Sequence, residues 1–133
     1  MQGYDLDDTL AKVEFDLASV RGLANVYRGA KVLYVPQEDF VVITARSHGT
    51  EALKTATREW LKEHQPNWTG RIIWCEGTEE EIIKKKAQAI NALNLTDFTD
   101  NNEDILKALA PLTNATLWKF SDGRKQRFNQ SED

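Results

Sequence analysis

Phe40-Val41-Val42-Ile43 is the stretch of sequence that decides the fold. Its residues are aromatic or branched aliphatic, and polar Gln37-Glu38-Asp39 precedes it, so the pattern predicts a buried strand. Strands and helices are predicted to alternate on both sides of it. The further strands expected are 1–6, 71–75, 95–99 and 115–120, and the helices are 50–64, 78–93 and 102–109. This alternation predicts an α/β fold, a three-layer α/β/α Rossmann-like domain with a mainly parallel five-stranded sheet.

Length and composition indicate one domain. The chain has 133 residues, 41% hydrophobic and 29% charged, and a net charge of −4, which argues against a general nucleic-acid coat. Cys75 is the only cysteine, which excludes an intrachain disulfide and a multi-cysteine zinc site. No apolar run is long enough to span a membrane and no secretory signal is visible, so we expect no membrane partner and a cytoplasmic location.

The domain is predicted to cover residues 1–122, with one small insert. Residues 10–36 carry scattered apolar positions and are too few for a separate domain, so we expect a hairpin or irregular flap followed by a short helix. This insert would be a minimal cap. Residues 123–133 are polar and are predicted to form a C-terminal tail.

An acidic turn follows the first predicted strand. Asp5-Leu6-Asp7-Asp8-Thr9-Leu10 places three carboxylates within four residues, where they repel one another. A bound divalent cation with oxygen ligands, such as Mg²⁺, would relieve that repulsion. A solvated acidic turn is the alternative, and the turn alone does not decide between them.

Polar residues also follow the central strand. Thr44-Ala45-Arg46-Ser47 combines a hydroxyl with the start of a helix, which is typical of an anion site. The alternative is that Thr44 or Ser47 is only a helix cap, and Thr50 is a further candidate for the cap of the helix at 50–64. A lysine lies on the helix predicted at 78–93. At about 100° per residue, Lys86 falls in the middle of the apolar stripe formed by Ile82, Ile83, Ile90 and Leu93. Either Lys86 snorkels to solvent, or its ammonium meets the acidic turn and a bound phosphate.

A second acidic segment follows the fourth predicted strand. Asp100 is expected at the same sheet edge as Asp5, because the carboxyl ends of parallel strands meet there. Asp104, one helical turn later, would support a metal through water or an indirect contact. Asp100 or Asn101 could instead cap the next helix.

These segments, in this order, resemble the haloacid dehalogenase (HAD) superfamily of phosphohydrolases. Asp5, Asp7 and Thr9 match its first motif, Asp-x-Asp-x-Thr. Thr44 within Val41-Val42-Ile43-Thr44 matches the second, and Arg46 completes an Ile-Thr-Ala-Arg run found in many members. Lys86 best matches the third, and Asp100 with Asn101 or Asp104 matches the fourth. The resemblance covers roughly residues 1–110, and the overall pattern is similar to the short HAD proteins of tailed phages, which would place the chain in the host cytoplasm.

The resemblance implies a mechanism. Asp5 would attack phosphorus and form an aspartyl-phosphate, while Asp7 would protonate the leaving oxygen and then activate water. Mg²⁺ would be held by Asp5, the Asp7 carbonyl and Asp100, with Asn101 and Asp104 as further candidate ligands. Thr44 and Lys86 would bind the phosphoryl oxygens, and Thr9 and Arg46 would contact substrate.

The substrate is expected to be a phosphomonoester of a nucleotide or a nucleic-acid end. The gaps between motifs leave no room for a large cap, and an open site suits a bulky substrate unless a second subunit of a homo-oligomer covers it. Arg124, Lys125 and Arg127 would contact further phosphates, or else belong to a solvated tail. Two other classes stay open: a non-catalytic or slow HAD-like module that binds phosphate or metal, and a phospho-acceptor signalling domain.

Overall fold

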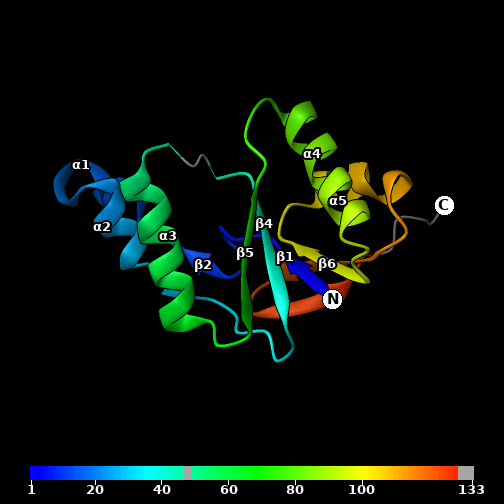
Figure 1. Ribbon diagram of the computed structural model, residues 1–133, viewed down its shortest axis with the longest axis horizontal. Coiled ribbons are helices and arrows are strands. Elements are labelled where there is room, and N and C mark those ends of the chain that lie inside the picture. The colour runs from blue at the N-terminus through cyan, green and yellow to red at the C-terminus, as the bar shows by residue number, and fades with distance from the viewer. Residues whose placement is uncertain (47–48, 129–133) are drawn as a thin grey trace.

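The computed structural model describes residues 1–46 and 49–128. Within these residues, one mainly parallel six-stranded sheet forms the centre of an α/β fold (Figure 1). All neighbouring strand pairs are parallel except the last, β7 with β8. The strand order is β5 (Trp68–Trp74), β4 (Phe40–Thr44), β1 (Gln2–Tyr4), β6 (Asp97–Asp100), β7 (Thr116–Ser121) and β8 (Arg124–Arg127).

Strand β4, the second in this order, contributes to two apolar cores. Phe40 and Val42 belong to one core, which includes residues of α3 (Glu51–His64). Val41 and Ile43 belong to the other, with residues of α4 (Glu79–Ala92) and α5 (Glu103–Leu109). Side chains alternate between the two faces of a strand, so the cores lie on opposite faces of the sheet. Figure 1 shows α3 on one side of the strands and α4 and α5 on the other.

Each of these three helices begins at a capping side chain. Thr50 accepts a hydrogen bond from the Leu53 amide, and Thr78 and Glu81 form the reciprocal capping box expected from their spacing. Asn102 caps α5, so the prediction of Asp100 or Asn101 as its cap was wrong. The alternative cap Ser47 lies outside the described residues.

The insert at 10–36 is a two-stranded ladder that encloses short helices. β2 (Ala11–Lys12) pairs antiparallel with β3 (Lys31–Val32). Between them lie η1 (Phe15–Leu17), α1 (Ala18–Arg21) and α2 (Leu23–Arg28). Val26 and Tyr27 of α2 pack in the same apolar core as α3. The hairpin and the helix were both predicted, but the helices lie inside the hairpin and do not follow it.

The polar C-terminal segment corrects two predictions. The sheet has six strands where five were expected, because Arg124–Arg127 forms β8 and is not part of a free tail. Asp122 and Gly123 adopt φ values of 52° and 79°, the left-handed conformations of a tight hairpin turn. The Lys125 ammonium lies 2.7 Å from the Tyr4 hydroxyl and adds a contact between β8 and β1. The short η2 (Ala110–Leu112) precedes β7, and none of the described helices is long and apolar enough to cross a membrane.

Candidate functional site

Most of the predicted site residues meet at the carboxyl ends of β1, β4 and β6. They line a pocket of about 220 Å³. The lining residues are Asp5, Asp7, Asp8, Thr44, Ala45, Arg46, Lys86, Asp100, Asn101, Asn102 and Ile105. Parallel sheets place ligand sites at this edge, so the topology brings segments that are far apart in sequence into one pocket.

The turn after β1 determines the positions of Asp5 and Asp8. The Asp5 amide bonds to the Thr99 carbonyl at 2.9 Å, which continues the sheet pairing, and the chain then closes a tight turn through amide bonds to the Leu6 carbonyl. Asp8 adopts a φ of 64° in that turn. The Asp5 side chain is therefore buried, while Asp8 is exposed at the rim.

Lys86 links the two buried carboxylates of the pocket. Its Nζ lies 3.2 Å from Asp5 Oδ1 and 2.8 Å from Asp100 Oδ2, and the residue is only 1% exposed. Lys84 and Lys85 are exposed, as the helical stripe predicted. Burial alone would lower the pKa of Lys86, but the two carboxylates outweigh it and raise the pKa above its ordinary value. Lys86 therefore remains a cation in the pocket.

Asp5 lies in a less favourable environment for its charge. Burial is the main cause that raises its pKa, to about 7, and the neighbouring Asp100 adds to the effect. The Lys86 ammonium opposes this shift only in part. A cation or hydrogen-bond donors near its second oxygen would favour the ionised form.

Asp100 has both carboxylate oxygens engaged by the protein. Oδ2 faces Lys86, and Oδ1 accepts a 3.0 Å hydrogen bond from the Asn102 amide. Asp100 is 1% exposed. This arrangement makes Asp100 the partner of Lys86, whereas the sequence predicted it as a metal ligand.

Asn101 takes the position beside Asp5 and Asp7. In one orientation its side-chain oxygen accepts from the Thr9 hydroxyl at 3.3 Å and faces two further oxygens. With the amide turned over, the nitrogen lies 3.2 Å from both the Asp7 carbonyl and Asp5 Oδ2 and donates to them. This second orientation satisfies both atoms of the amide, so the Asn101 nitrogen is the atom that faces Asp5 and Asp7.

Arg46 does not extend toward solvent. Its Nε lies 3.1 Å and its Nη2 2.5 Å from the two carboxylate oxygens of Asp7. The Arg46 side chain is 4% exposed. Arg46 was predicted to contact substrate, and it does line the pocket, with its guanidinium bonded to Asp7.

Two residues that sequence reasoning missed hold Arg46 from behind. Its guanidinium carbon lies 3.8 Å from the ring centroid of Tyr27, and its Nη1 donates to Thr57 Oγ1 at 2.9 Å. Tyr27 comes from the insert and Thr57 from α3. No local sequence signal marks either residue, because both read as ordinary buried positions of amphipathic helices.

The remaining predicted residues take different places. Thr44 lines the pocket, and its Oγ1 accepts a 2.9 Å hydrogen bond from the Arg46 amide. Thr9 is fully buried beneath Asp5, with its hydroxyl 3.5 Å from Asp5 Oδ2. Asp104 is exposed on the first turn of α5 and does not line the pocket.

Carboxylate clusters of the kind that holds a metal are absent from the part of the chain that the structure describes. Within residues 1–46 and 49–128, no three His, Cys, Asp or Glu side chains form a metal-binding group. The oxygen set at Asn101 is of a different kind, since it contains one carboxylate, one backbone carbonyl and one side-chain amide. Hard cations such as Mg²⁺ accept all three kinds of oxygen.

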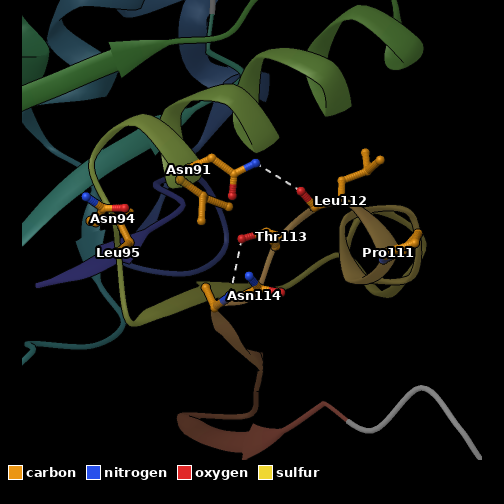
Figure 2. Close-up of a pocket in the computed structure, with 9 residues that line it drawn as sticks. Asn91, Asn94, Leu95, Pro111, Leu112, Thr113 and Asn114 are labelled. Atoms are coloured by element: carbon orange, nitrogen blue, oxygen red, sulfur yellow. Dashed lines mark hydrogen bonds between the residues drawn. The ribbon is translucent and has the colours of Figure 1, made fainter.

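Two other cavities differ from this pocket in chemistry. The larger one, of about 470 Å³, lies at the opposite ends of the strands, between the end of α4 and the η2–β7 connection (Figure 2). Asn91 bonds there to the Leu112 carbonyl, and no ionisable side chain lines this cavity. A groove of about 410 Å³ shares Asp8 and Asn101 with the pocket around Asp5 and Lys86, and its other lining residues include Lys12, Leu33, Lys119 and Phe120.

Comparison with protein-family models, curated proteins and solved structures found no match to this chain.

Proposed function

We propose that this chain is a Mg²⁺-dependent phosphohydrolase of the HAD type, with a three-layer Rossmann-like arrangement, that acts through an aspartyl-phosphate. The observation that carries the proposal is Lys86, buried between Asp5 and Asp100 at the carboxyl edge of a parallel sheet. A buried lysine that only neutralised two carboxylates would contribute little net stability. A phosphate ion brought to the same pocket would gain a fixed cation.

Asp5 is the proposed nucleophile. Its carboxylate oxygen attacks phosphorus, the P–O bond to the leaving group breaks, and the phosphoryl group stays on Asp5. Asp7 gives a proton to the departing oxygen and later takes one from the water that cleaves the acyl phosphate, which regenerates both carboxyl groups. The positions of Asp5 and Asp7 in one pocket support this division of roles.

Lys86 and Thr44 are the proposed phosphate-binding groups. The Lys86 ammonium lies beside Asp5 and supplies positive charge where negative charge collects during transfer. The Thr44 hydroxyl lines the same pocket from the end of β4 and donates to a phosphoryl oxygen. Both groups are fixed before substrate arrives, because both residues are almost completely buried.

The Asp5 carboxylate, the Asp7 carbonyl and the Asn101 side-chain amide are groups whose oxygens suit Mg²⁺. The Asn101 amide lies 3.2 Å from both of the other groups, and with its oxygen turned toward a bound cation it would complete this set. When bound, Mg²⁺ would offset the repulsion between the Asp5 carboxylate and the phosphate. We propose Asn101 as the third protein ligand, in place of Asp100, whose oxygens are engaged by Lys86 and the Asn102 amide. Asp104 has no part in this proposal.

The proposed substrate is a phosphomonoester of a nucleotide or nucleic-acid end. No residue of the insert lines the pocket, so the insert leaves its mouth open toward the adjoining groove. Lys12 and Lys119 lie along that groove, and each is paired with one carboxylate at its exposed side. A leaving group that lies in the groove would meet these cations, which suits a second phosphate.

One observation favours a second candidate, a slow phosphate- or metal-binding module. Both Asp7 oxygens accept hydrogen bonds from Arg46, so each oxygen already has a donor from the protein. A binding module never has to protonate and deprotonate Asp7, so the contact with Arg46 would not impair it. A hydrolase must allow Asp7 to exchange its proton within this contact.

Hydrolysis of a generic aryl phosphate, with and without Mg²⁺, separates the two candidates. Wild type should turn over the ester only with Mg²⁺, Asp5→Asn should lose turnover, and Asp39→Asn, which changes an exposed carboxyl outside the pocket, should retain it. A folded wild type that binds Mg²⁺ and phosphate without turnover of any ester would favour the binding module. Turnover that survives Asp5→Asn would exclude Asp5 as the nucleophile.

A further inference from the structure

Arg46 connects the insert to the Asp7 carboxylate through side-chain contacts. Its guanidinium donates through Nε and Nη2 to the two oxygens of Asp7. On its other side it stacks on Tyr27 of α2 and donates through Nη1 to Thr57 of α3. The guanidinium therefore contacts protein groups along two of its edges and on one face.

Each contact removes a different freedom of the guanidinium. Stacking on Tyr27 fixes its plane, and the bond to Thr57 fixes its rotation within that plane. The Thr57 hydroxyl is itself oriented, because it donates to the Leu53 carbonyl at 3.0 Å. An arginine side chain has several rotatable bonds, so without these contacts it would hold Asp7 in a range of positions.

We propose that Tyr27 and Thr57 are positioning residues, which orient the Asp7 carboxylate through Arg46 for proton transfer to the leaving group. The insert at 10–36 thereby supports the acid–base residue from behind, and it does not act as a lid over the pocket. The lining of the pocket agrees, since Arg46 contributes to it and no insert residue does. This inference rests on the proposed function, because it assigns the proton transfer to Asp7.

A purely structural role for Tyr27 and Thr57 predicts a different result. Loss of packing would lower the amount of folded enzyme and reduce the hydrolysis of every ester by the same factor. Loss of orientation at a general acid affects mainly esters whose leaving group needs a proton. An alkyl phosphate needs that proton, whereas a dinitrophenyl phosphate departs as a stable phenolate without it.

The test compares kcat/KM for these two esters in the full-length chain with Mg²⁺. This parameter covers the steps up to departure of the leaving group, so the later role of Asp7 as a base does not enter. The variants are Tyr27→Leu and Thr57→Val, with Tyr27→Phe and Thr57→Ser as conservative forms that keep the ring face or the hydroxyl. Tyr34→Leu is the matched control, since Tyr34 packs on Tyr4 and Phe120. Asp7→Asn gives the full loss of the acid.

We expect Tyr27→Leu and Thr57→Val to lower the ratio of alkyl to aryl kcat/KM by about 10-fold, within the roughly 10²- to 10⁴-fold range of a whole general acid. The two conservative forms and Tyr34→Leu should keep the wild-type ratio. The near-isosteric Thr57→Val carries the test if Tyr27→Leu does not fold. An unchanged ratio in folded Thr57→Val overturns the inference while the proposed function stands. A wild type that hydrolyses neither ester overturns the proposed function, and this inference falls with it.

Discussion

Lys86 Nζ lies 3.2 Å from Asp5 Oδ1, although 81 positions separate the two residues in the chain. Helix α4 thus places the Lys86 ammonium beside the Asp5 carboxylate, which directly follows β1. The same ammonium lies 2.8 Å from Asp100 Oδ2. This buried triad of one cation and two carboxylates controls both the charge and the stability of the pocket.

Replacing the cation should destabilise the protein. Lys86→Met leaves Asp5 and Asp100 buried without a partner, and we expect a loss of about 3–5 kcal/mol in the free energy of unfolding at neutral pH. The pKa of Asp5 is raised to about 7 in the folded state, from an ordinary value of 3.8. Between these two pH values the folded protein keeps a proton that the unfolded chain has released, so stability falls as pH rises from about 4 to 7. The loss should therefore shrink toward pH 4. Lys86 has a raised pKa, so its own contribution persists up to its ordinary value of 10.5 and is lost above it.

Urea unfolding of wild type and Lys86→Met across this pH range checks the prediction. Lys84→Met is the matched control, because Lys84 is exposed on the same helix. Equal losses at pH 4 and pH 7, or no loss at either, would show that Lys86 does not neutralise the buried carboxylates.

Asn101 should determine the affinity for Mg²⁺. Asn101→Asp keeps the oxygen beside Asp5 Oδ2 and the Asp7 carbonyl and adds a negative charge, so binding should tighten by about 10-fold. Asn101→Ala should weaken it, on the order of 10-fold. Titration calorimetry with Mg²⁺ measures both effects. Asn102→Asp adds the same charge one residue away and should change the affinity less, and an unchanged affinity in Asn101→Ala would mean that the amide donates through its nitrogen.

The groove beside the pocket should select substrates with a second phosphate. Lys119→Ala and Lys12→Ala each remove one groove cation, so KM for a nucleoside bisphosphate should rise by roughly 10- to 100-fold, as expected for the loss of one charge-assisted hydrogen bond. KM for an aryl phosphate should not change. Lys62→Ala, at the end of α3, is the control. If both esters respond equally, the groove does not hold the leaving group.

The turn between β7 and β8 should be sensitive to side chains that disfavour left-handed backbone. Gly123 has a φ of 79°, and nothing lies within 4 Å of a Cβ added there, so only backbone conformation opposes a substitution. Gly123→Val should cost roughly 1–2 kcal/mol, and Gly123→Asn clearly less. Thermal unfolding measures both, and equal Tm values for the two variants would contradict an ordered hairpin at this position.

The sequence could predict the features that depend on local pattern. The helical stripe placed Lys86 on the buried face of its helix and left open whether its ammonium snorkels to solvent or meets the acidic turn. Parallel strands predicted that Asp5, Thr44 and Asp100 meet at one edge. The Asp122-Gly123 pair was an available hairpin signal, but β8 is polar and lacks an apolar alternation, so it was interpreted as a tail. Strand β8 forms because it pairs with the edge of β7, and a tertiary contact of this kind leaves no signal in the local sequence pattern.

The partners of the polar side chains could not be predicted in the same way. Asp100 and Asn101 are neighbours with similar side chains, and only their tertiary surroundings direct one to Lys86 and the other to Asp5. Arg46 meets Asp7 because Tyr27 and Thr57 close the space behind it. Those two residues lie in segments whose pattern indicates only amphipathic helices.

The most direct test of the central claim is to locate the phosphoryl group during turnover. Wild type is mixed with a phosphate ester carrying ³²P, quenched in acid within milliseconds, and digested for peptide mapping. We predict an acid-stable, hydroxylamine-sensitive label on Asp5, formed with Mg²⁺ and absent in Asp5→Asn. A label on another residue, or steady turnover with no label on Asp5 at any time, would contradict the account.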